Sequence, residues 1–222
     1  MTAWFLFLFC SVGFAQPSGE EVLKKVAAHF PGVQDYTVTL DITPDIERLN
    51  VPPMHVRMFF KQPDKFHFES DNFALLPKEG LAFNPARLLT RFSVDDVNAD
   101  SMDGRKEIKL LLRPKEERAR AAKVVLYIDS SAWKPTRIVT SLFDGRTMTA
   151  TFRYEEQSGH LMPSLLTVQF ESPARDTTEQ DSNIDEASPI QRPRMPRNGM
   201  ITIRYSDYQI NTGLSDDIFD KK

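Results

Sequence analysis

The sequence of 222 residues contains a single cysteine, Cys10, and no surplus of positive charge. One cysteine cannot form an internal disulfide or a thiolate metal cluster, which excludes disulfide-stapled scaffolds and zinc modules. There are 28 Lys and Arg residues against 31 Asp and Glu residues, so the net charge is -3. Such a chain lacks the cationic excess that binds a polyphosphate backbone, and we expect no nucleic-acid partner.

The sequence also lacks the common signatures of hydrolases and nucleotide-binding enzymes. It has no G-x-S-x-G, no H-E-x-x-H, no Walker loop and no dinucleotide-type glycine run. Ser131-x-x-Lys134 and Ser70-Asp71-Asn72 match two elements of penicillin-interacting enzymes, but they occur in the reverse order. Ser131 also precedes Pro135 in a strand-to-turn corner, not on a helix one turn from a lysine. We therefore expect no enzyme.

Metal and cofactor sites are not expected either. Asp96, Asn98, Asp100 and Glu107 have the spacing of a calcium loop, but Ser101 stands where the sharp turn needs glycine. A solvated hairpin tip accounts for the same residues. The four histidines are scattered, and His55 and His67 fall on the polar faces of predicted neighbouring strands, so exposed sheet positions explain them.

Long apolar runs are confined to the N-terminus, at residues 4–15. This run is shorter than the roughly 20 residues of a spanning helix, and the small residues Gly13 and Ala15 precede Gln16. Residues 1–15 are therefore predicted to be a signal peptide cleaved after Ala15, with an uncleaved anchor as the alternative. Cleavage would remove Cys10, and a cysteine-free exported chain of this size suits a bacterial periplasm.

The remaining chain shows one clear amphipathic helix. Ser18 and Glu21 have the spacing of a capping box, and apolar residues then recur at helical spacing over residues 20–30 until Pro31. A second, short helix is predicted after Asn84 and Pro85, with Leu88 and Leu89 on its apolar side.

Most other segments alternate apolar and polar residues with a period of two, which predicts antiparallel strands. The segment 173–198 differs, because it has four prolines and no aromatic residue. It is predicted to be a mobile Pro-rich loop inserted in one domain, residues 16–222. The predicted strands span residues 36–42, 54–62, 65–70, 94–100, 106–112, 123–129, 136–143, 146–154, 165–172 and 200–210.

Two helices are too few to cover one face of so wide a sheet. The sheet is therefore expected to curl into a half-barrel around an apolar hollow, where Met and Phe give walls that adapt to flexible chains. The predicted lid residues are Val22, Leu23, Val26, Leu88 and Leu89. The predicted ligand-binding residues are Val56, Met58, Phe60, Phe66, Phe68, Leu126, Ile128, Phe152, Leu166, Val168 and Phe170.

Several short motifs follow one another along the chain. A K-x-P turn leads into an aromatic-rich strand at residues 61–68, and an aromatic-Asn-Pro step follows at residues 83–85. An L-x-P-K strand end lies at residues 111–115, and a strand with a Trp-Lys-Pro corner at residues 125–135. In their order and spacing, these motifs resemble the outer-membrane lipoprotein carrier (LolA-like) family, and the resemblance covers residues 20–172.

This resemblance implies a fold and a function. The fold is an incomplete antiparallel β-barrel with a helical lid over an apolar cavity, and the family carries lipoprotein acyl chains across the periplasm. The chain departs from the family at Gln62, where the carriers often have an arginine that helps to hold the lid. Arg57 is a candidate substitute, but alternation points it away from the face of Phe60. The tail at residues 210–219 lies outside the carrier pattern.

The sequence thus predicts a periplasmic, non-enzymatic, monomeric carrier of lipid or lipoprotein acyl chains. A membrane-bound donor or acceptor protein is an expected partner. The alternative is an envelope sensor or scaffold subunit that uses the same fold as a protein-interaction module, with the tail and the loop as docking elements.

Overall fold

The structure is a computed structural model that describes residues 17–28, 32–70, 90–102, 104–116, 121–172 and 198–220. Three predictions concern segments outside the described residues: the signal peptide at 1–15, the helix with Leu88 and Leu89, and the loop at 173–197. Among the described residues, no helix is long and apolar enough to cross a membrane.

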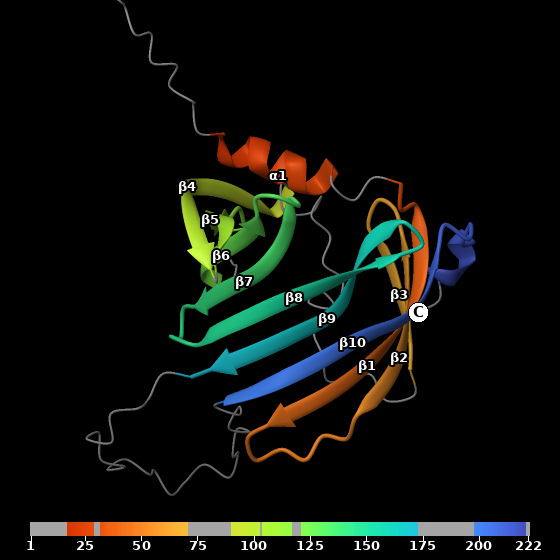
Figure 1. The fold of residues 1–222 in the computed structure, drawn as a ribbon. Coiled ribbons are helices and arrows are strands. Elements are labelled where there is room, and N and C mark those ends of the chain that lie inside the picture. The colour runs from red at the N-terminus through yellow and green to blue at the C-terminus, as the bar shows by residue number, and fades with distance from the viewer. Residues whose placement is uncertain are drawn as a thin grey trace, which may run out of the picture.

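The chain is mainly β, and its strands form one curved antiparallel sheet (Figure 1). The order is β3-β2-β1-β10-β9-β8-β7-β6-β5-β4, and the sheet stays open because β3 and β4 are its two edges. The expected half-barrel is thereby confirmed. The strands are β1 (Asp35–Ile46), β2 (Met54–Lys61), β3 (Lys65–Glu69), β4 (Phe92–Met102), β5 (Arg105–Pro114), β6 (Ala121–Asp129), β7 (Lys134–Leu142), β8 (Thr147–Gln157), β9 (His160–Glu171) and β10 (Asn198–Ile210).

The first and last strands meet inside the sheet. β1 pairs with β10, so the β2–β3 hairpin extends the sheet on one side and the meander from β9 back to β4 extends it on the other. The strands match the predicted segments within three residues, except that β1 continues to Ile46, four residues further than expected, and β9 begins at His160, five residues earlier. Ser158 and Gly159, with φ of 50° and 78°, make the two-residue turn that joins it to β8.

The helix α1 (Gly19–Ala28) begins at the predicted capping box (Figure 1). The Ser18 backbone N–H donates to Glu21 Oε2 over 2.9 Å, and the Glu21 N–H donates to Ser18 Oγ over 3.3 Å. The Ser18 N–H bond lowers the pKa of Glu21, so the cap is charged at neutral pH. The helix buries Val22, Leu23 and Val26 against the sheet.

Candidate functional site

The predicted ligand-binding residues all lie on one face of the sheet, the face on which α1 packs; we call it the inner face. The register shows this directly. Met58 stands opposite Phe68 and Phe60 opposite Phe66 in the β2–β3 hairpin, and Phe152 stands opposite Leu166 between β8 and β9. Residues opposite each other on antiparallel strands share a face, so alternation placed these side chains together.

The inner face is divided into two apolar clusters. The first lies between α1 and β4–β7, and it contains the three predicted lid residues of α1, Val22, Leu23 and Val26, together with Leu126 and Ile128. Both Leu126 and Ile128 are fully buried there. The second cluster lies on β1–β3 and β8–β10, and Ile138 joins the two. It holds the other predicted ligand-binding residues: Val56, Met58, Phe152 and Leu166 are buried, and Phe60, Phe66, Phe68, Val168 and Phe170 are half-buried.

A row of aromatic rings crosses the second cluster from the sheet edge toward its middle. Phe66 and Phe60 have ring centroids 5.0 Å apart, and Phe60 lies 5.0 Å from Tyr36. The row continues through Tyr208, 5.7 Å from Tyr36, to Tyr205, a further 6.5 Å away. The predicted site residues include none of these three tyrosines. Alternation alone would place Tyr205 and Tyr208, which are three residues apart, on opposite faces of the sheet.

A β-bulge in β10 explains how both tyrosines reach the inner face. Tyr205 stands opposite Leu40, and the register with β1 then slips by one residue near Asp207, whose φ is 54°. The extra residue inverts the alternation, so Tyr208 returns to the inner face. Its hydroxyl donates to the Pro163 carbonyl of β9 over 2.8 Å.

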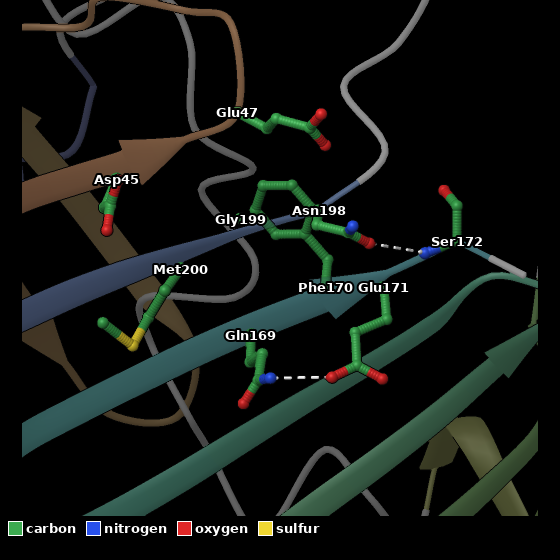
Figure 2. Close-up of a pocket in the computed structure, with 9 residues that line it drawn as sticks. All are labelled: Asp45, Glu47, Gln169, Phe170, Glu171, Ser172, Asn198, Gly199 and Met200. Carbon is green, nitrogen blue, oxygen red and sulfur yellow. Dashed lines mark hydrogen bonds between the residues drawn. The ribbon is translucent and has the colours of Figure 1, made fainter. Parts of the chain in front are cut away.

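An open pocket of about 600 Å³ lies at the other end of these strands, where β1 and β9 end and β10 begins (Figure 2). Only Phe170 of the predicted set lines it. Figure 2 shows its ring against the backbone at Gly199, the residue opposite it on β10. The described residues that line it are Asp45, Glu47, Gln169, Phe170, Glu171, Ser172, Asn198, Gly199 and Met200.

The polar groups of this pocket bond largely to one another. Gln169 Nε2 donates to Glu171 Oε1 over 2.7 Å, and the Ser172 N–H donates to Asn198 Oδ1 over 3.3 Å. The three carboxylates of Asp45, Glu47 and Glu171 make the rim acidic. The acidic lining of this pocket thus differs from the apolar side chains of the second cluster.

Three solved structures share this architecture. A domain from Vibrio parahaemolyticus described as an outer membrane lipoprotein-sorting protein aligns with a TM-score of 0.64 and 12% identity, over 90% of this chain and 95% of that one. A LolA superfamily protein from Nitrosomonas europaea aligns with a TM-score of 0.60 and 13% identity, over 93% of this chain and 99% of that one. This chain has the LolA-like fold.

A DUF1329 family protein from Desulfovibrio piger aligns comparably, with a TM-score of 0.63 and 13% identity over 90% of this chain and 96% of that one. No protein-family model matches the sequence, and no curated protein sequence matches it. The likeness therefore concerns the LolA-like fold alone, and the site must be argued from the residues of this chain.

Gln62, the residue that departs from the carrier pattern, has a structural role in this LolA-like sheet. The Gln62 side chain donates through Nε2 to the Val33 carbonyl over 2.8 Å, which fastens the end of β2 to the segment before β1. Arg57 lies on the outer face, with its guanidinium 5.3 Å from the centroid of the Phe59 ring. It points away from Phe60, as alternation predicts.

Ser131 and Lys134, the two ends of the Ser-x-x-Lys motif, each lie close to another side chain of the sheet or its turns. Ser131 Oγ donates to Asp129 Oδ1 over 2.5 Å in the turn between β6 and β7. Lys134 Nζ lies 5.4 Å from the centroid of the Tyr154 ring. Partial burial raises the pKa of Asp129, but hydrogen bonds from Ser131 and Ala132 and the charge of Lys134 together outweigh it, so the net shift is downward.

The calcium-like spacing falls on the β4–β5 hairpin, where Asn98 Nδ2 donates to Asp96 Oδ2 over 2.7 Å. His55 and Asp41 pair on the outer face, with Nδ1 and Oδ1 2.5 Å apart. In the part of the chain that the structure describes, no group of three or more His, Cys, Asp or Glu side chains could hold a metal ion.

Proposed function

We propose that this protein is a non-enzymatic periplasmic carrier that binds acyl chains of a lipid or lipoprotein on the second cluster of its inner face. The observation that carries the proposal is that, in the part of the chain that the structure describes, α1 packs on only one of the two clusters of that face. The helix α1 packs over β4–β7, and the apolar side chains of β1–β3 and β8–β10 lie outside its cluster. Half-buried Phe66, Phe68 and Val168 offer that surface to a ligand.

Transfer of apolar area from water supplies the affinity. Burial of a methylene contributes about 0.8 kcal/mol, so about ten methylenes correspond to a gross 8 kcal/mol and a micromolar dissociation constant. Losses of translational and chain freedom lower this value, which keeps binding reversible. A carrier must release its cargo, so reversible binding suits hand-over to a membrane-bound acceptor.

The lid assignment concerns the three buried residues of α1. Val22, Leu23 and Val26 are at most 1% exposed, so in this structure α1 is packed as core over Leu110 and Leu126. An acyl chain longer than the second cluster would reach this part of the face only after α1 moves. We assign α1 the role of a lid that opens for cargo.

Native mass spectrometry of the protein purified from a bacterial periplasm tests the carrier, followed by organic extraction of the bound material. We expect a chain that begins at Gln16 and carries one lipid or acylated peptide. A protein that is empty and also fails to take up a fluorescent fatty acid would contradict the carrier. That result would favour the envelope sensor or scaffold.

A matched pair of variants tests the location of the site. Phe68→Gln places an amide on the half-buried inner face, and Phe143→Gln makes the same change at a side chain that is 76% exposed in the β7–β8 turn. We expect Phe68→Gln to weaken fatty-acid binding about tenfold, the effect of losing roughly 1.4 kcal/mol of apolar contact. Phe143→Gln should leave binding unchanged, and equal loss in both would place the ligand elsewhere.

A further inference from the structure

Four of the five tyrosines of this chain converge at one place on the inner face. Tyr36 comes from β1, Tyr154 from β8, and Tyr205 and Tyr208 from β10. The fifth, Tyr127, lies on the outer face, where the Arg137 guanidinium is 3.9 Å from the centroid of its ring. We call the first four the tyrosine cluster.

The tyrosine cluster lies where two neighbouring strands separate. The ladder between β9 and β10 ends at the pair Leu165 and Arg204, although β9 starts at His160 and β10 continues to Ile210. Figure 1 shows the β8–β9 hairpin turning away from β10 in this region. The Tyr208 hydroxyl crosses the opening to the Pro163 carbonyl, and Pro163 stands opposite Tyr154 on β8.

One hydroxyl of the cluster is left without a partner. The Tyr154 hydroxyl is buried, and among the described residues it makes no hydrogen bond. A buried polar group without a partner is costly, and native proteins usually satisfy such groups with protein, water or ligand atoms. Tyr154 therefore supplies an unused donor beside the apolar surface where an acyl chain is proposed to lie.

The cluster stays uncharged over the ordinary pH range. Burial raises the pKa of Tyr36, Tyr154, Tyr205 and Tyr208. The neighbouring tyrosines raise the pKa of Tyr205 and Tyr208 further, because a second phenolate nearby would be repelled. A neutral phenol both donates and accepts hydrogen bonds, so the Tyr154 hydroxyl can donate to a neutral carbonyl oxygen.

We propose that the tyrosine cluster binds the carbonyl group through which an acyl chain is attached to its ester or amide, with the Tyr154 hydroxyl as the donor. The inference rests on the proposed function and deepens it, because it gives the ligand a direction. The hydrocarbon lies along the aromatic row and the second cluster, and the ester or amide end lies at the opening between β9 and β10.

The experiment compares two lipids that differ only in this carbonyl, dipalmitoyl phosphatidylglycerol and its dihexadecyl ether analogue, and it adds an N-palmitoyl peptide as an amide ligand. For an ester cargo, we expect the wild-type protein to bind the ester roughly 2- to 12-fold more tightly than the ether, the range of one hydrogen bond, and Tyr154→Phe to bind the two equally. For an amide cargo, we expect Tyr154→Phe to bind the peptide more weakly than the wild type by the same factor. Which of the two effects is larger identifies the cargo class.

Two further variants separate the ligand contact from a structural effect. Tyr127→Phe removes a hydroxyl from the outer face and should retain the preference for a carbonyl. Tyr208→Phe loses the bond to Pro163 and should lower the melting temperature, whereas Tyr154→Phe should not, because its hydroxyl has no partner to lose.

The outcomes distinguish the two proposals. The carbonyl subsite would be overturned, and the carrier left intact, if the wild-type protein bound the ester and the ether equally and Tyr154→Phe bound the peptide as tightly as the wild type. An ester preference that persists in Tyr154→Phe would overturn it as well. A wild-type protein that binds none of the three would overturn the carrier and the subsite together.

Discussion

The buried carboxylate of Asp35 binds the backbone of Gly213, 178 residues further along the chain. The Gly213 N–H lies 3.2 Å from Oδ1 and 3.1 Å from Oδ2, and the Thr212 and Leu214 N–H groups also donate to this carboxylate. Asp35→Asn would replace one acceptor oxygen with a donor that faces these N–H groups. We expect a loss of about 1–3 kcal/mol in the free energy of unfolding, measured with urea.

Asp217→Asn is the matched control for this substitution. Its carboxylate is exposed and takes part in a local hydrogen bond with Ser215, so we expect stability to change by less than about 0.5 kcal/mol. Equal stability of the two variants would show that the anchoring of the tail by Asp35 contributes nothing. The anchoring also makes deletion of the tail a poor test of partner docking, because deletion would weaken the sheet.

A second anchor of the tail depends on pH. Lys61 Nζ lies 2.7 Å and Lys65 Nζ 3.2 Å from Asp216 Oδ1, and these contacts lower the pKa of Asp216 below its usual 3.8. A carboxyl with a lowered folded pKa stabilises the fold above the unfolded pKa and loses this contribution as the pH falls through the folded value. We therefore expect the tail to loosen below about pH 4.

An NMR titration of the Asp216 carboxyl and the Lys61 side chain measures this effect. The Lys61 signal should move with the Asp216 titration, and Asp216→Asn should abolish the movement. Asp144 is the comparison, because Arg146 lowers its pKa in the distant β7–β8 turn. If Asp144→Asn also changed the movement of the Lys61 signal, the ion pair between Lys61 and Asp216 would not be the cause of that movement.

Gly199 makes room for the Phe170 ring at the edge of the acidic pocket. A Cβ at Gly199 would lie 2.5 Å from Phe170 Cζ and 3.2 Å from the Asp45 carbonyl oxygen. Gly199→Ala should cost roughly 1–3 kcal/mol through overpacking. In a double-mutant cycle followed by urea unfolding, Phe170→Leu should recover part of this loss, whereas additive losses would contradict the contact.

Alternation in the sequence was sufficient to predict the inner face of the sheet. Met58 and Phe68 were assigned to one surface because each strand shows side chains to a given face at every second residue. The same rule would place Tyr205 and Tyr208 on opposite faces of the sheet. It fails there because the bulge at Asp207 adds one residue to β10, and no local sequence pattern indicates this bulge.

Contacts between distant parts of the chain also could not be predicted from the sequence. The order of the strands follows from the pairing of β1 with β10, and the Asp35 anchor joins the two ends of the described chain. Neither contact has a local periodic signal. Leu126 and Ile128 alternate with polar neighbours in the same way as Met58. They belong to the first cluster because α1 packs on that part of the sheet, a position that alternation does not reveal.

The contact between Gly19 and Val94 connects the stability of α1 with its proposed role as a lid. A Cβ at Gly19 would lie 2.7 Å from Val94 Cβ, so Gly19→Ala must push the start of α1 away from β4. Despite the better helix propensity of alanine, we expect a loss of about 1–3 kcal/mol in stability. Because α1 is held less tightly, uptake of a fluorescent fatty acid should become faster in stopped-flow measurements.

The double variant Gly19→Ala with Val94→Gly removes both the Cβ and the Cγ atoms that the new methyl group would meet, and it should restore the slow uptake of the wild type. Lys24→Ala changes an exposed position of the same helix and should alter neither quantity. A destabilised Gly19→Ala protein with unchanged uptake would show that cargo reaches the inner face without displacing α1. The lid role would then be wrong, while the second cluster would keep its role as the acyl-binding surface.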